Sequence, residues 1–255
     1  MSKLRLTEQF NDASKSVHSI SNLLVNSRLL VLFTQRQLYA RAIACFYFVF
    51  KALEDALIVA FERDKSIGSL KEVIQPLFRA QAFEEDLIFY LGPHWRSQVQ
   101  RSAAIVAYEE RIKHLLETDP RLLLAHVYTQ HLAMAAGGQI IKRMARKQMQ
   151  LEDGHGTAAY EYPEGRPSAS ELKSALKTKI DEVGTTFSEE VCKKLVEEHC
   201  LVFKYNNEII TAFRIRWQPF LKGLWVLCTS QTAVKITVAV LIPVTLGLGY
   251  QLMSR

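Results

Sequence analysis

The sequence has few of the features that build a disulfide scaffold, a β-sheet or a self-sufficient active site. Its four cysteines, in 255 residues, form no C-x-x-C pair, so a reducing compartment is the simplest interpretation. No stretch alternates cleanly between apolar and polar residues, which argues against strands. The H-E-x-x-H, G-x-S-x-G and phosphate-loop patterns are also missing. Their absence disfavours zinc peptidases, serine hydrolases and P-loop enzymes.

The charge balance excludes few classes of binding partner, but it argues against nucleic-acid binding. The formal net charge is +6, and the basic residues are scattered along the chain. A nucleic-acid-binding domain would concentrate a larger positive charge on one face. We therefore expect no nucleic-acid partner, whereas an anionic ligand or an acidic protein partner fits the same numbers.

What the sequence does contain is helical periodicity. Hydrophobic residues make up 49% of the chain, and they recur at spacings of three and four. The stretch 151–168 is rich in Gly, Pro and charge and is expected to be a surface loop. The pattern predicts one all-α domain, a helical bundle over 1–216. The expected helices are 7–24, 31–62, 68–90, 97–117, 121–149, 169–183 and 188–216.

The C-terminal end differs from the rest. The run 236–253 carries no charge and is bracketed by Lys235 and Arg255. As a helix it would rise about 27 Å, close to the thickness of the endoplasmic reticulum bilayer. A buried core helix is the alternative. We expect a transmembrane tail anchor joined by a short linker over 217–235, with the bundle on the cytosolic side.

His18 is a candidate metal ligand. A neutral imidazole can bind iron through one nitrogen and donate a hydrogen bond from the other. Asn22 lies one helical turn further along and offers an oxygen that accepts this bond. Taken alone, a histidine at this position is more often an ordinary surface residue.

Paired glycines interrupt the expected helix 121–149. Gly137 and Gly138 each cost about 1 kcal/mol against alanine in a helix interior. Without Cβ atoms they allow a flat ligand to approach the backbone, although a tight helix crossing is the alternative. A planar macrocycle between His18 and this helix would use both features. Its carboxylates could then meet Lys15, Lys173, Lys177 and the hydroxyl of Tyr128, residues whose ordinary role is a solvated or packed surface.

Several segments in a fixed order resemble the eukaryotic haem oxygenases. They are "ASKSVHS", "ALEDAL", "YLGPHW", "LLLAHVYTQHL" and "GGQIIKRMARK", and the similarity runs over 7–215. The resemblance implies a helical fold that holds haem b, both substrate and cofactor, between two helices. It implies conversion of haem to biliverdin, iron and carbon monoxide with oxygen and electrons. The electrons would come from NADPH through the flavoprotein reductase of the endoplasmic reticulum membrane, and biliverdin reductase is a further expected partner.

The resemblance also assigns residues. His18 becomes the proximal iron ligand, and Gly137 and Gly138 become the distal glycines. Phe203 and Asn206 match pocket-lining positions. The contacts to the haem propionates fall on Lys15, Tyr128, Lys173 and Lys177.

The distal helix departs from the family pattern. The family usually reads Gly-Asp-x-x-Gly-Gly, whereas this chain has Ala133 and Met134 in the first two places. Gln130 stands for an arginine, His131 for a tyrosine and Asn22 for the proximal glutamate. A thioether neither shuttles protons nor holds water well, so we expect slow turnover or relaxed choice of the cleaved carbon. His131 is a candidate proton donor, and His131 or Met134 is a candidate ligand of the resting iron.

Two other functions are compatible with the sequence. The chain could be a haem carrier or sensor without catalysis. It could also be an interaction protein, like the tail-anchored helical bundles that regulate apoptosis, although their Asn-Trp-Gly-Arg signature is missing.

Overall fold

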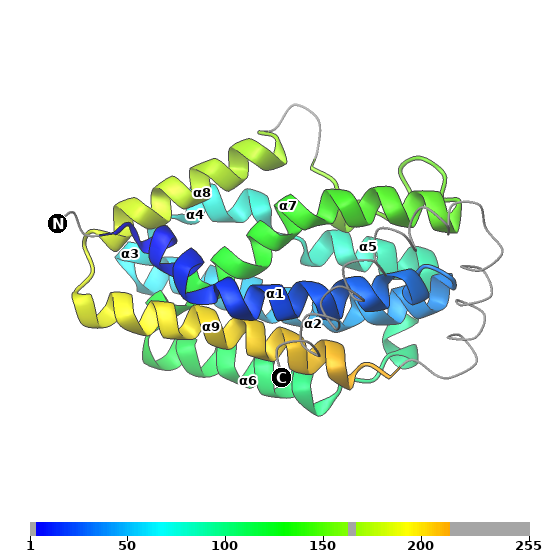
Figure 1. Ribbon diagram of the computed structural model, residues 1–255, viewed down its shortest axis with the longest axis horizontal. Helices are drawn as coiled ribbons and strands as arrows, with labels where there is room; N and C mark the ends of the chain where they lie inside the picture. The colour runs from blue at the N-terminus through cyan, green and yellow to red at the C-terminus, as the bar shows by residue number, and fades with distance from the viewer. Residues whose placement is uncertain (1–3, 163–166, 215–255) are drawn as a thin grey trace, which may run out of the picture.

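The computed structural model describes residues 4–162 and 167–214. Within these ranges the chain is helical and has no strand, as the periodicity predicts (Figure 1). The short 3-10 turns are η1 (Gln75–Leu77), η2 (Trp95–Gln98), η3 (Pro120–Leu122) and η4 (Ala158–Tyr160). The α-helices are α1 (Leu6–Leu32), α2 (Arg36–Arg63), α3 (Lys65–Gly68), α4 (Lys71–Ile74), α5 (Ala80–Leu91), α6 (Ala103–Thr118), α7 (Leu123–Met149), α8 (Ala169–Gly184) and α9 (Glu189–Ala212).

Four long helices form the body of the molecule. Helix α9 packs against both α1 and α7, and α2 packs against α5 and α6. Helices α1 and α9 run side by side along the long axis of the molecule, and α8 lies across one end of it (Figure 1). This arrangement brings α1, α2, α7 and α9 around a common interior.

Local sequence signals set most helix boundaries. Ser168 and Glu171 form a reciprocal capping box at the start of α8, which satisfies two backbone N–H groups left without helical partners. Ser188 accepts a hydrogen bond from the backbone N–H of Val191 at the start of α9. Such caps typically contribute about 1 kcal/mol each.

Several expected helix bounds differ from the structure. The helix expected over 31–62 begins at Arg36, and the helix expected over 97–117 begins at Ala103, after η2. The first helix does not end at residue 24 but continues to Leu32, so the predicted break falls inside α1. The predicted single helix 68–90 is wrong, because η1 and a short extended step separate α4 from α5. Pro76 lies in η1 and has no backbone N–H to continue a helix.

The buried core has two parts that meet along α2. One contains aliphatic residues of α2, α6, α7 and α9, such as Leu53 and Leu195. The other is aromatic and contains Tyr39, Phe50 and Tyr160. None of the helices in the described part is long and apolar enough to cross a membrane. The predicted linker 217–235 and anchor 236–253 lie outside the described residues.

Candidate functional site

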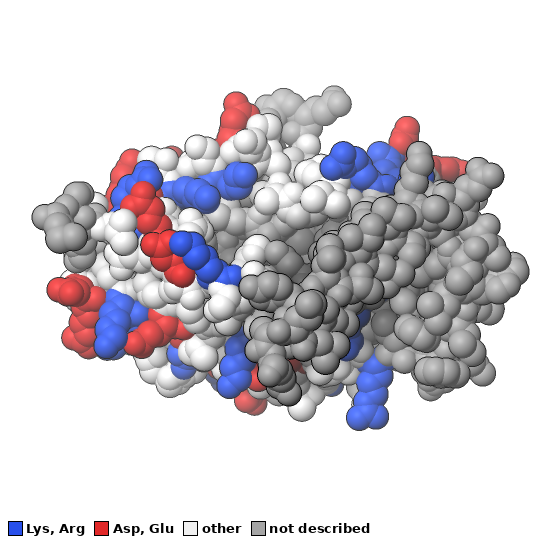
Figure 2. Space-filling model, viewed as in Figure 1, with Lys and Arg blue, Asp and Glu red and all other residues white. Residues whose placement is uncertain are grey.

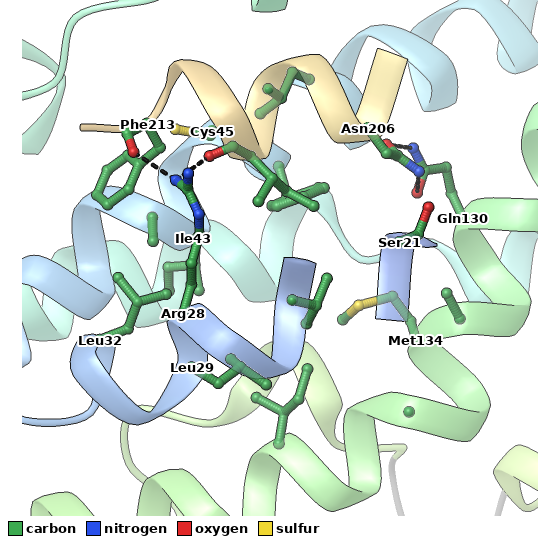
Figure 3. Close-up of a pocket in the computed structure, with 18 of the residues that line it drawn as sticks. Ser21, Arg28, Leu29, Leu32, Ile43, Cys45, Gln130, Met134, Asn206 and Phe213 are labelled. Atoms are coloured by element: carbon green, nitrogen blue, oxygen red, sulfur yellow. Dashed lines mark hydrogen bonds between the residues drawn. The ribbon is translucent and has the colours of Figure 1, made fainter. Parts of the chain in front are cut away.

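A cavity of about 300 Å³ lies between α1, α2, α7 and α9 (Figure 3). Apolar side chains cover most of its wall, and polar groups are few. Concave, largely apolar sites with a few placed polar groups are typical of cofactor binding. The lining includes His18, Ser21, Arg28, Tyr39, Cys45, Phe50, Thr129, Gln130, Ala133, Met134, Gly137, Tyr160, Phe203, Asn206 and Phe213.

His18 reaches this cavity from α1. Its ring stands edge-on to the ring of Phe203 on α9, with centroids 5.7 Å apart and an interplanar angle of 72°. His18 is also exposed to solvent. The side chain of Asn22, the expected partner of this imidazole, lies outside the described part of the structure. The structure therefore brings together His18 and Phe203, two of the residues predicted for the site.

The two glycines of α7 have different surroundings. Gly137 lines the cavity, and a Cβ atom placed there would meet no atom within 4 Å. A Cβ atom on Gly138 would lie 2.9 Å from Cδ1 of Tyr160. Gly137 thus leaves open space for a flat ligand, whereas Gly138 permits close packing of α7 against the η4 segment. The packing interpretation thus describes Gly138, and the ligand-binding role of Gly137 stays a prediction.

Met134 and Ala133 line the same side of the cavity as Gly137, about one helical turn earlier on α7. The face of α7 on which the sequence predicts a replaced proton-delivering group is therefore apolar at these two positions. The polar side chains near Met134 are Ser21, Gln130 and Asn206 (Figure 3). Any hydrogen bond offered to a ligand on this side comes from such residues.

His131 lies behind the cavity wall and not on it. The residue is fully buried, and its ring stands edge-on to that of Phe50 at a centroid distance of 5.3 Å. Phe50 lines the cavity. Neither ring nitrogen of His131 has a hydrogen-bond partner in the described part of the chain, and Oε1 of Glu54 lies 3.8 Å from its Nε2. The predicted roles of His131 as proton donor or iron ligand stay predictions.

Tyr128 is buried next to the cavity. Its hydroxyl donates to Oδ1 of Asn11 at 3.0 Å, and its ring contacts those of Phe10 and His199. Burial raises the pKa of Tyr128, so its hydroxyl stays protonated and remains a donor. This hydroxyl lies outside the set of atoms that line the cavity.

The predicted lysines lie on α1 and α8, helices that contact each other. Figure 2 shows positive side chains over both helices on one face, next to acidic ones. Lys15 is exposed and pairs with Asp12 at 2.8 Å, while Lys173 and Lys177 are half-buried. None of the three lines the cavity, so a role for them requires that the ligand's charged groups extend toward this surface.

Sequence reasoning missed two sets of polar contacts among the residues that line the cavity. The hydroxyl of Tyr39 donates to that of Tyr160 at 2.8 Å, and burial raises the pKa of both. The guanidinium of Arg28 donates to the carbonyl oxygens of Ile210 and Phe213 (Figure 3). No local motif marks these contacts, because the partners come from distant parts of the chain.

No cluster of three or more His, Cys, Asp and Glu side chains that could hold a metal occurs among the described residues. Cys45 lines the cavity, but burial raises the pKa of its thiol to about 11. It is therefore not a thiolate ligand near neutral pH.

Comparison with known proteins decides the family. The family model described as "Heme oxygenase" matches residues 4–212. The chain belongs to the haem oxygenase family. Its relatives include the enzyme of Rhodella violacea, which is 34% identical over 68% of this chain and 72% of its own length. Human haem oxygenase 1 is 29% identical over 80% of this chain and 70% of its own.

Solved structures agree with this assignment. Haem oxygenase 2 of Chlamydomonas reinhardtii, solved without haem, is 45% identical and superposes with a TM-score of 0.81, covering 84% of this chain and 100% of that one. Haem oxygenase 1 of Synechocystis, in complex with haem, gives a TM-score of 0.75 at 26% identity over 88% and 98%. The predicted all-α haem oxygenase fold is confirmed. The protein is an oxidoreductase of the biliverdin-producing haem oxygenase class.

Proposed function

We propose that the cavity between α1 and α7 binds haem b, with His18 as the iron ligand and Gly137 against the opposite face. The observation that carries this proposal is that both residues line one cavity although they come from different helices. An imidazole on one wall and open space at a glycine on the other fit a flat molecule with a metal at its centre.

Bound haem supplies the oxygen and redox chemistry, and it is itself the substrate. The protein then has to bind, orient and protect it. The apolar lining excludes water from most of the macrocycle. Lys15, Tyr128, Lys173 and Lys177 are proposed to hold the two propionates toward the surface formed by α1 and α8. The orientation set by these contacts determines which edge of the macrocycle faces α7.

Met134 is proposed to slow turnover and to relax the choice of the cleaved carbon. Relatives with an aspartate at this position have a group that binds water and carries protons, and a thioether has neither property. Gln130 and Asn206 supply the remaining polar groups beside Met134. We expect biliverdin to form more slowly than in such relatives, with more than one isomer.

Electrons are proposed to come from NADPH through the flavoprotein reductase of the endoplasmic reticulum. The end of α7 carries Lys142, Arg143, Arg146 and Lys147, a basic surface suited to an acidic partner. Lys142 already contacts Glu161 at 3.3 Å, and Arg146 pairs with Asp153. Reductase binding therefore has to compete with these two ion pairs. Biliverdin reductase is the proposed acceptor of the product.

The membrane location is a separate proposal. The uncharged run 236–253 has the length and composition of a tail anchor. We propose that it inserts into the endoplasmic reticulum membrane and leaves the helical domain in the cytosol.

The test uses the full chain in detergent micelles. Haem is titrated in the absence of oxygen, and a Soret band that saturates at one equivalent supports the binding proposal. Reductase and NADPH are then added in air, and the pigments are separated by chromatography. Slow loss of the Soret band with several biliverdin isomers supports the proposed function. Stable haem without pigment would instead identify the carrier or sensor considered from the sequence.

A further inference from the structure

A continuous chain of buried polar side chains connects the cavity with the surface of the molecule. It crosses α6, α7 and α9, and its two cavity members are Gln130 and Asn206. Most of its members are almost completely buried, so each hydrogen bond in it matters for stability and for orientation. In order from the surface the chain consists of Arg111, Glu198, His126, Tyr108, Gln130 and Asn206.

Glu198 fixes the direction of the hydrogen bonds at the outer end. Burial alone would raise the pKa of its carboxyl group, but the hydrogen bonds from His126 and Arg111 outweigh that effect and bring the pKa to about 2. An ionised carboxylate only accepts hydrogen bonds. Oε1 of Glu198 lies 3.0 Å from Nε2 of His126. Nε2 of this imidazole therefore carries the hydrogen and donates it.

The donor and acceptor roles at Glu198 also determine those of His126 and Tyr108. Burial lowers the pKa of His126, so its ring is neutral and Nδ1 has a lone pair. This nitrogen lies 3.0 Å from the hydroxyl of Tyr108, which therefore donates to it. Because a phenol has one hydrogen, the same oxygen can only accept from its other neighbour, Nε2 of Gln130, at 3.1 Å.

The hydrogen bond from Gln130 to Tyr108 fixes which way the Gln130 amide is turned, and this in turn fixes the amide of Asn206. The second hydrogen on Nε2 of Gln130 goes to Oδ1 of Asn206 at 2.8 Å, and Nδ2 of Asn206 donates back to Oε1 of Gln130 at 3.4 Å. Within the described part of the chain, both hydrogen bonds of the Asn206 side chain go to Gln130. Its amide nitrogen therefore keeps one N–H that is not used in this pair.

Two other polar side chains in the described cavity lining already donate their hydroxyl hydrogens to protein groups. The hydroxyl of Thr129 donates to the carbonyl oxygen of Ala125 at 2.9 Å, and that of Ser21 donates to Oδ1 of Asn207 at 2.8 Å. Met134 has no hydrogen to donate. Within the described part of the chain, the remaining N–H of Asn206 is thus a hydrogen-bond donor that lies beside Met134 (Figure 3).

We propose that Glu198 is a positioning residue: acting through His126, Tyr108 and Gln130, it orients the Asn206 amide so that an N–H donor faces the ligand side of the haem cavity. This inference rests on the proposed function, because the ligand of the cavity is taken to be haem. It assigns a purpose to a buried carboxylate that does not itself reach the cavity. Removal of the carboxylate or of the phenol lets the two amides turn over and present oxygen instead.

The test measures the C–O stretching frequency of carbon monoxide bound to ferrous haem in the full chain. A hydrogen-bond donor beside the ligand lowers this frequency, because it stabilises negative charge on the ligand oxygen. We expect the band to move to higher frequency in Tyr108→Phe, in Glu198→Gln and in Asn206→Leu. The matched control is Tyr90→Phe, which loses a partly buried tyrosine hydrogen bond, in this case to the carbonyl oxygen of Gly156 at 2.8 Å. Its band should not move.

A second measurement needs no haem. The ¹⁵N chemical shifts of His126 in the haem-free protein report which ring nitrogen carries hydrogen, and we expect Nε2. A hydrogen on Nδ1, or a C–O band that stays unchanged in both Tyr108→Phe and Asn206→Leu, would overturn the inference. Failure of the wild-type chain to bind haem would refute the proposed function instead, and the His126 tautomer would still decide whether this imidazole donates to Glu198 and accepts from Tyr108. If Glu198→Gln does not fold, Tyr108→Phe carries the test.

Discussion

His18 and Gly137 lie on the wall of the same cavity, the first on α1 and the second on α7. The two helices need not touch for this arrangement, because α9 packs against both of them. An imidazole that can bind a metal and a backbone position without a side chain thus line the same largely apolar cavity. The function proposed for this cavity gives each of the two residues a distinct role that can be measured.

The first prediction concerns the iron ligand. His18→Ala should weaken haem binding by at least about tenfold, which is about 1.4 kcal/mol, because the iron loses its protein ligand. Added imidazole should restore the absorption spectrum of the wild-type complex. Haem titration followed at the Soret band measures both effects. His155→Ala is the matched control, because His155 is an exposed histidine stacked on Phe89. Wild-type affinity in His18→Ala would show that another residue binds the iron.

The second prediction separates the two glycines. Gly137→Ala should stabilise the haem-free protein by about 1 kcal/mol, since alanine favours the helix and the new Cβ meets open space. The same change should weaken haem binding, because the Cβ occupies the face that the macrocycle needs. Gly138→Ala should have the opposite effect on the stability of the haem-free protein. Its Cβ would press on the buried ring of Tyr160 and destabilise the protein by roughly 1–3 kcal/mol.

Urea unfolding of the two haem-free variants measures the stability effects, and haem titration measures the binding effects. The same sign of stability change in both variants would contradict the different surroundings seen for these glycines.

Residues that act through local pattern could be predicted from the sequence, and residues that act through distant contacts could not. His18, Met134 and Gly137 stand out because each is unusual in its own helix, and all three line the cavity. The hydrogen bond between Tyr39 and Tyr160 joins α2 to η4, and no sequence pattern in either segment predicts it. The continuation of α1 to Leu32 has a related cause, because Arg28 in its last turns donates to the carbonyl oxygens of Ile210 and Phe213 at the end of α9. No local pattern in α1 shows this contact.

The sequence predicts which lysines share a helix face, but it does not predict how far they lie from the cavity. Spacing places Lys173 and Lys177 on one face of α8, and the structure leaves both half-buried there. Spacing does not show how far that face lies from the cavity wall, because the angle between α8 and the long helices is set by packing. A sequence pattern thus identifies candidate partners of a ligand without fixing their distance from it.

The third prediction concerns Met134, the residue proposed to slow turnover because it stands where an aspartate is expected. Met134→Asp should raise the rate of biliverdin formation and narrow the set of isomers, because a carboxylate can hold water and move protons beside the ligand. Met134→Leu is the matched control. It should leave the rate close to that of the wild type, since leucine has a similar volume and is equally unable to carry protons. Single-turnover kinetics with chromatography of the pigments gives both quantities. An aspartate variant no faster than the leucine variant would show that Met134 does not limit proton delivery.

The last prediction concerns pH and His199. This ring lies between Phe10 and Phe203, is 2% exposed, and has no hydrogen-bond partner at Nε2 in the described part of the chain. Burial lowers its pKa from 6.5 to about 4, and the nearby imidazoles of His126 and His18 add to the effect.

The sign of the effect on stability follows from these pKa values. Between pH 6.5 and about 4, the unfolded chain binds a proton at this position and the folded protein does not. The free energy of unfolding therefore falls as the pH is lowered through this window, by at most about 1.4 kcal/mol per pH unit from this group. His199→Phe keeps an aromatic ring in the same stack but cannot titrate. Its stability should depend less on pH than that of the wild type between pH 6.5 and about 4, and urea unfolding of the haem-free proteins at several pH values measures the difference. Since all other titrating groups are common to both proteins, parallel stability curves would mean that His199 becomes protonated in the folded state as readily as in the unfolded one, and that its burial does not hold the ring neutral.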